Sequence, residues 1–214
     1  MMKKLASPVF RSDQDGLNIV LNWRGAPDEE FGVYATAFLE GARRLARRAL
    51  RHGRVRDLDA LPIVFLYRHA LELSMKGIVL QGNQHMRLHG AGLPDERLWR
   101  TLAGHRLTGL LPNVRHVFTF VGWKWRWPDP RIRTFAEVQR ILHDLDSVDP
   151  ASVAFRYPTN KHGEGAVPHH FSFNLYGFVS VVDALAEALD TAVFGLNAEY
   201  DRGNEALAAV RALR

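Results

Sequence analysis

Apolar residues recur every three or four positions in five stretches of the chain, which is the spacing of helices that bury one face. The pattern predicts helices at about residues 31–52, 61–80, 105–120, 134–145 and 172–196. Shorter helical pieces are expected at about 96–102 and 204–214. Stretches containing glycine and proline separate these segments, so the sequence predicts an all-α fold, a bundle of about five helices.

The chain divides into three predicted parts. Residues 1–30 contain the turn-forming segments Asp15-Gly16 and Gly25-Ala26-Pro27, so we expect a short irregular or extended N-terminal arm. Residues 31–200 are expected to form the bundle, and residues 201–214 a C-terminal tail or short helix.

Two signals predict particular helix ends. Gly82 is expected to end the second helix. Thr134, with Glu137 three residues on, predicts a capping box at the start of the fourth long helix.

The second predicted helix is apolar over most of its surface, which makes it the expected central helix of the bundle. At about 100° per residue, its polar residues Arg68, Glu72, Lys76 and His69 project at about 0°, 40°, 80° and 100°. We call these four residues the polar stripe. Two interpretations remain open: the polar stripe faces solvent, or it lines a cleft and binds a substrate.

The first predicted helix carries a run of arginines with no acidic residue among them. Arg43, Arg44, Arg47, Arg48 and Arg51 cover one side of this helix. The chain is basic overall, with a formal charge of +5 and a pI near 9.8. Arg44, Arg47 and Arg51 are therefore expected to contact the phosphates of RNA or of a nucleotide, and the alternative is a solvated helix face.

Composition excludes several classes of function. The chain has no cysteine, so disulfides, thiolate metal sites and a cysteine nucleophile are excluded. His85 and His89 have the spacing of a helical pair, but no HExxH, phosphate-loop or Gly-Xaa-Ser-Xaa-Gly motif occurs, and we expect no metal and no cofactor. No apolar stretch is long enough to span a membrane, and the expectation is a cytoplasmic protein.

Tryptophans and cations alternate between residues 123 and 127. Such a segment stacks unpaired bases while holding their phosphates, or it packs its aromatic side on a core. The alternation alone favours the second interpretation.

Three segments resemble parts of bacterial proteins that have a HEPN-like helical bundle: Tyr67-Arg-His-Ala-Leu-Glu-Leu-Ser-Met-Lys76, Gly104-His-Arg-Leu107 and Asp149-Pro-Ala-Ser-Val-Ala-Phe-Arg-Tyr-Pro158. The resemblance implies the same fold between about residues 31 and 196. It also implies a metal-independent endoribonuclease, or an effector derived from one, in phage defence or a toxin–antitoxin system. Family members complete their site across a homodimer, and a neutralising or sensing protein is expected to be encoded nearby.

The family's usual catalytic signature is an arginine followed, after four to six residues, by a histidine. Three pairs in the chain match this spacing: Arg47 with His52, Arg100 with His105, and Arg156 with His162.

Arg156 lies in a family-like segment, so the resemblance favours His162 as proton donor or acceptor and Arg156 as the group that stabilises the phosphorane charge. His105, also in a family-like segment, is the second candidate. The alternative is a non-catalytic helical module that binds a partner protein or a nucleotide, with Arg156 holding its loop through an ion pair to a carboxylate such as Glu72.

Overall fold

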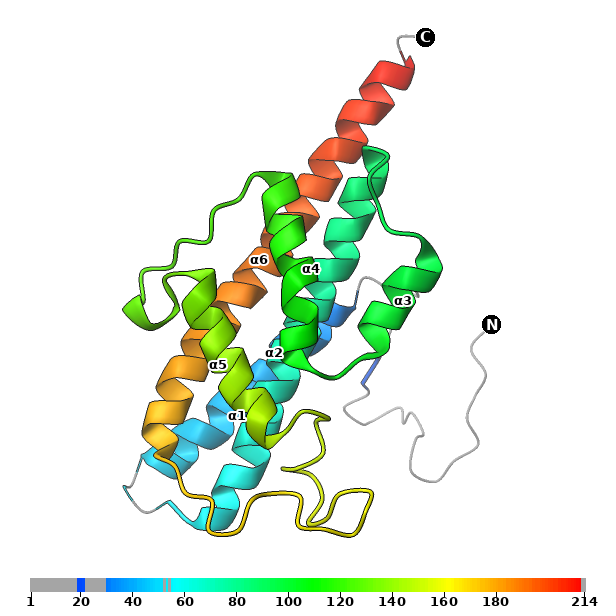
Figure 1. Ribbon diagram of the computed structural model, residues 1–214. Helices are drawn as coiled ribbons and strands as arrows, with labels where there is room; N and C mark the ends of the chain where they lie inside the picture. The colour runs from blue at the N-terminus through cyan, green and yellow to red at the C-terminus, as the bar shows by residue number, and fades with distance from the viewer. Residues whose placement is uncertain (1–18, 22–29, 52, 54, 213–214) are drawn as a thin grey trace.

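The computed structural model describes residues 19–21, 30–51, 53 and 55–212, and these residues form an all-α fold (Figure 1). Within these ranges the chain has six α-helices, one short 3₁₀ helix and no extended strand. The α-helices are α1 (Phe31–Leu50), α2 (Asp57–Leu88), α3 (Asp95–Ala103), α4 (Leu107–Val121), α5 (Phe135–Val148) and α6 (Leu175–Ala212), and the 3₁₀ helix η1 spans Pro130–Ile132. The predicted helical bundle is confirmed, and the short helix expected near residues 96–102 is α3.

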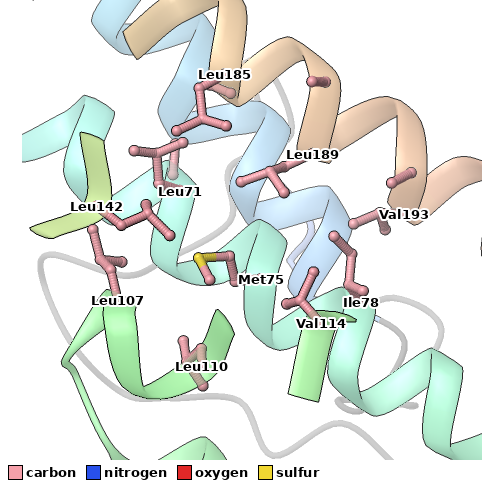
Figure 2. Close-up of a cluster of buried hydrophobic side chains, with 14 of the residues drawn as sticks. Leu71, Met75, Ile78, Leu107, Leu110, Val114, Leu142, Leu185, Leu189 and Val193 are labelled. Atoms are coloured by element: carbon pink, nitrogen blue, oxygen red, sulfur yellow. The ribbon is translucent and has the colours of Figure 1, made fainter. Parts of the chain in front are cut away.

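Helix α2 lies at the centre of the bundle and packs against α1, α4 and α6, as predicted. Its side chains Leu71, Met75 and Ile78 are fully buried. Figure 2 shows them among apolar side chains of the neighbouring helices, including Leu107, Leu110, Val114, Leu185, Leu189 and Val193. Burying a leucine or methionine side chain contributes about 1.5–3 kcal/mol, so this layer supplies much of the stability.

Helix α1 begins at Phe31 and ends at Leu50, close to the predicted bounds. The expected N-terminal arm lies mostly outside the described residues. Of the residues expected to lead into α1, only Glu30 is described, and it is the N-cap of the helix.

The predicted bounds of α2 are wrong at both ends. The helix begins at Asp57, where Arg56 and Asp59 form a capping box, and it continues six residues past Gly82 to Leu88. A Cβ atom at Gly82 would lie 2.4 Å from the side chain of Val117, so the glycine lets α2 and α4 approach closely. A glycine that permits close packing has the same appearance in sequence as one that ends a helix.

The predicted C-terminal boundary is also wrong. Residues 201–212, expected as a separate tail or short helix, continue α6, which is 38 residues long and extends past the other helices in Figure 1. Gly195 lies inside this helix. A Cβ atom there would lie 2.7 Å from the Trp123 ring, so the glycine leaves the space that the ring fills. Gly203 lies inside it next to Leu88 of α2 in the same way.

Two local predictions are confirmed. Thr134 and Glu137 form the expected capping box at the start of α5, where the Thr134 N–H donates to Glu137 Oε2 at 2.7 Å. In the segment 123–127 the tryptophans pack on the core, and the cations between them are exposed. Trp125 donates its indole N–H to the Ile132 carbonyl at 2.6 Å, which fastens the segment to η1.

Candidate functional site

Three members of the polar stripe, Arg68, Glu72 and Lys76, lie inside the bundle. Their side chains are exposed to only 1%, 2% and 8%. These residues share one side of α2 because they are four positions apart. The solvent-strip interpretation is therefore wrong for these three residues, and they form a buried line of alternating charge.

Glu72 joins the cations of this line to His105. Its Oε1 accepts from Lys76 Nζ at 2.8 Å and lies 2.9 Å from His105 Nδ1, while its Oε2 accepts from Arg68 at 3.1 Å. Burial acts to raise the pKa of Glu72, but the hydrogen bonds and charges of Lys76 and His105 outweigh burial and hold the pKa below its usual value. Glu72 is thus an ionised carboxylate inside the bundle.

Arg68 fastens two distant loops to α2. Its Nε donates to the Asp149 carbonyl at 2.9 Å, and one terminal nitrogen donates to the His105 carbonyl at 2.9 Å. The carboxylates of Asp146 and Asp149 lie 3.6 Å from its guanidinium. We call Arg68, Glu72, Lys76, His105, Asp146 and Asp149 the α2 cluster.

The two aspartates of the α2 cluster also hold backbone. Asp146 accepts from the N–H groups of Leu107 and Thr108, so a residue of α5 caps the start of α4. Asp149 Oδ1 accepts from the N–H groups of Val153 and Ala154 and folds the loop after α5. Sequence reasoning missed both aspartates as site residues, although Asp149 opens one of the family-like segments.

His105 is the member of the α2 cluster that reaches solvent. It lies between α3 and α4, and its side chain is 55% exposed. An ionised Glu72 accepts only from a protonated Nδ1, so the neutral ring keeps a lone pair on Nε2. In the part of the chain that the structure describes, no hydrogen bond uses this Nε2. The geometry therefore supplies a proton acceptor with a defined orientation.

His69, the fourth member of the polar stripe, is half-buried between aromatic rings. Its ring lies 4.5 Å from that of Phe38 and stacks at 5.5 Å on that of Phe65. Burial lowers the pKa of His69, and the charges of Arg156, Lys76 and Arg68 lower it further, while Glu72 acts in the opposite direction. His69 therefore adds a neutral ring beside the α2 cluster.

Arg156 lies near His69. Its guanidinium is 5.4 Å above the Phe65 ring, and its Nε donates to the Ser152 carbonyl at 2.6 Å. Among the described residues it has no ion pair, so the anticipated pairing with Glu72 is not formed, and Arg68 and Lys76 occupy that carboxylate instead.

The structure does not bring Arg156 and His162 into contact within the described ranges. His162 is exposed in the turn between Thr159 and Gly165, where its backbone N–H donates to the Asn160 side chain at 2.8 Å.

Arg100 and His105, the second pair with the family's spacing, have separate partners. Arg100 forms an exposed ion pair with Glu96 at 2.6 Å, whereas His105 binds Glu72. His52 lies outside the described residues.

A second charged region lies on α1. Arg44, Arg47 and Arg51 are exposed, and in the described part of the chain none of them is within ion-pair distance of a carboxylate. We call these three residues the arginine face. Their neighbour Arg43 is different, because its Nε donates to Asp183 at 2.7 Å.

The arginine face borders a groove of about 530 Å³ between α1, α2 and α6. Arg47 and Arg51 line it together with Arg43, Tyr67 and Asp183. The carboxylate of Asp183 is already occupied, because the Tyr67 hydroxyl donates to it at 3.0 Å in addition to Arg43. The groove therefore presents the cations of Arg47 and Arg51 to a ligand.

No group of three or more histidine or acidic side chains within the described residues has the arrangement of a metal site. The rings of His85 in α2 and His89, the C-cap residue of this helix, have centroids 5.0 Å apart and lie beside Phe120. Comparisons with protein-family models, curated proteins and solved structures find no significant match to the chain.

Proposed function

We propose that the protein binds RNA through the arginine face of α1. The observation that carries the proposal is that Arg44, Arg47 and Arg51 are exposed without ion pairs, while the neighbouring Arg43 is held by Asp183. Arginines without carboxylate partners are the ones available to phosphates, and each phosphate contact releases condensed counterions. The groove beside Arg47 and Arg51 adds space for a bound phosphate next to the helix.

The resemblance to HEPN-like proteins supports RNA over other polyanions. In such a protein the bound RNA is also the substrate, the working form is a homodimer, and the biological setting is phage defence or a toxin–antitoxin system. We extend the proposal to that setting and to a regulatory protein encoded nearby. Light scattering on the purified protein tests the dimer.

Binding is tested with a fluorescently labelled single-stranded RNA, whose anisotropy is measured at low salt. Changing Arg44, Arg47 and Arg51 together to glutamate should weaken binding at least about a hundredfold. In a plot of log affinity against log salt concentration, the slope should become shallower by about two. Each phosphate contact to a single strand contributes about 0.7 to this slope, and the variant removes three such contacts. A matched control changes the exposed arginines Arg97, Arg133 and Arg140 to glutamate, with the same change in net charge.

The proposal fails if the wild-type protein binds no RNA at low salt. It also fails if the control variant loses as much affinity as the α1 variant, because net charge would then explain the binding. Circular dichroism establishes that both variants keep their helices.

A second candidate function is metal-independent RNA cleavage with His105 as the general base. The observation that favours it is the hydrogen bond between His105 Nδ1 and the buried Glu72, which leaves an exposed Nε2 to take the proton of a ribose 2′-hydroxyl. Lys76, which shares Glu72 Oε1 with His105, is the cation that would face the developing phosphorane charge.

Cleavage is tested in EDTA with purified protein. If RNA is cut, His105→Ala should lower the rate at least about a hundredfold, and His116→Ala, at an exposed position of α4, should not. His162→Ala and Arg156→Ala test the pair that the HEPN resemblance favours. If RNA is bound and not cut, the non-catalytic module is the better description, since every charged group of the α2 cluster already has a partner inside the protein.

A further inference from the structure

An apolar pocket of about 300 Å³, lined by no residue of the arginine face, lies between α2, α5, α6 and the loop that precedes α6. Four phenylalanines contribute to its wall: Phe155, Phe171, Phe173 and Phe178. Phe171 and Phe173 are each 39% exposed, so part of each ring is open to solvent beside the pocket. Their ring centroids are 5.5 Å apart, and the Phe173 ring meets that of Phe178 edge-on at 5.6 Å.

Only two charged residues line this pocket, Arg68 and Asp144, and they differ in availability. Each nitrogen of Arg68 already donates to a protein oxygen, and its side chain is 1% exposed. The carboxylate of Asp144 is exposed and, in the part of the chain that is described, has no hydrogen bond or ion pair. The pocket therefore offers an apolar, aromatic interior and one free negative charge.

We propose that this pocket binds a small organic cation with an aromatic body, of the arylalkylamine class. The faces of phenylalanine rings attract a cation, and the Asp144 carboxylate pairs with an ammonium group. A volume of about 300 Å³ is at the lower end for ligand pockets, which limits the ligand to about ten to fifteen non-hydrogen atoms. The proposal is independent of RNA binding, because none of its residues belongs to the arginine face.

The charge of the ligand separates this proposal from general apolar binding. Tryptamine and indole-3-propionate share the indole ring and the two-carbon linker and differ in the charge at the end. Isothermal titration calorimetry on the full chain should give a Kd in the low millimolar range or tighter for tryptamine. Binding of indole-3-propionate should be at least about tenfold weaker.

Three variants test the location. Asp144→Asn should remove the difference in affinity between the two ligands. The control is Asp201→Asn, at an exposed carboxylate of α6 that does not line the pocket, and it should leave the difference unchanged. Val181→Trp places a larger side chain in the pocket wall and should abolish tryptamine binding. Asp144 is exposed, so its variant should fold even if Val181→Trp does not.

The proposal is wrong if tryptamine produces no heat at concentrations up to about 10 mM, or if indole-3-propionate binds equally well. It is also wrong if Asp144→Asn retains the full preference for the amine. If tryptamine does not bind and Val181→Trp changes the mass measured by light scattering, a second copy of the chain covers this pocket.

Discussion

The α2 cluster and the arginine face both contain arginines, but these arginines differ in burial and in partners. Arg68 of the α2 cluster is 1% exposed, and each of its nitrogens is bound to a protein oxygen. Arg47 of the arginine face is exposed and, unlike its neighbour Arg43, forms no ion pair within the described residues. A buried cation requires partners to offset its desolvation, whereas an exposed one does not. The comparison separates cations that hold the protein together from cations that are free for a ligand.

Removing a carboxylate tests this difference most strongly. Glu72→Ala should lower the free energy of unfolding by about 3–5 kcal/mol, because it leaves the charge of Lys76 buried without its carboxylate and removes one of the three carboxylates around Arg68. The control is Glu96→Ala, which removes an ion pair of the same four-residue spacing from the exposed face of α3 and should cost about 0.5 kcal/mol or less. Urea denaturation measures both, and equal effects would contradict the comparison.

Changing the shape of a buried cation should have the next largest effect. In Arg68→Lys the charge remains, but one ammonium cannot reach Glu72 and the carbonyls of both His105 and Asp149 in the geometry of the guanidinium. We expect a loss of about 2 kcal/mol in the free energy of unfolding. Arg100→Lys, at the exposed pair on α3, is the control. A melting temperature that is unchanged in both variants would show that stability does not depend on the guanidinium geometry of Arg68.

The dependence of stability on pH should also come from the interior. The folded-state pKa values of His69 and Glu72 lie below their ordinary values of 6.5 and 4.5, so the unfolded chain binds more protons as the pH falls. Stability present at neutral pH should therefore decrease below about pH 6.5 through His69, and again below about pH 4.5 through Glu72.

Urea denaturation from pH 8 to pH 4 measures this dependence. His69→Gln should reduce the slope in the upper range, while glutamine at Arg44, Arg47 and Arg51 should leave it as in the wild type. An upper slope that is identical in His69→Gln would assign the effect to another group, such as His85, whose pKa burial also lowers.

The smallest expected difference lies within α1 itself. Arg43 is three-quarters buried and donates to Asp183, so Arg43→Ala should cost about 1 kcal/mol in the free energy of unfolding. Arg47→Ala, one helical turn away and exposed, should change it by less than about 0.5 kcal/mol. The order should reverse in RNA binding, where Arg47→Ala is the more harmful variant. Anisotropy and thermal melts on the same two proteins measure both effects.

The helices were predictable from the sequence because their apolar spacing reflects burial of one face. Their ends were less predictable, since Gly82 and Gly203 lie inside helices where another helix approaches closely. That role depends on contacts with Val117 and Leu88, from other segments of the chain, and no local pattern reports it. Local signals such as the Thr134 capping box were reliable because all their atoms belong to one turn.

The candidate site was predictable only in part, for the same reason. Four-residue spacing placed Arg68, Glu72 and Lys76 on one side of a helix, and the structure has them there. Their burial could not be predicted, because it depends on segments that are distant in the sequence. His105 lies 33 residues from Glu72, and Asp149 lies 81 residues from Arg68. The resemblance favoured Arg156 with His162, although within the described residues no hydrogen bond or ion pair joins them.

The long sequence separations within the α2 cluster have a kinetic consequence. The bonds from Arg68 to the carbonyls of His105 and Asp149 close loops of 37 and 81 residues. Closing such loops costs entropy before the bonds form, so we expect them to be absent from the folding transition state, with φ-values near zero at Arg68. Substitutions there should accelerate unfolding and leave the folding rate nearly unchanged. The α2 cluster would then form late in folding and set the unfolding rate, and with it the lifetime of the folded molecule.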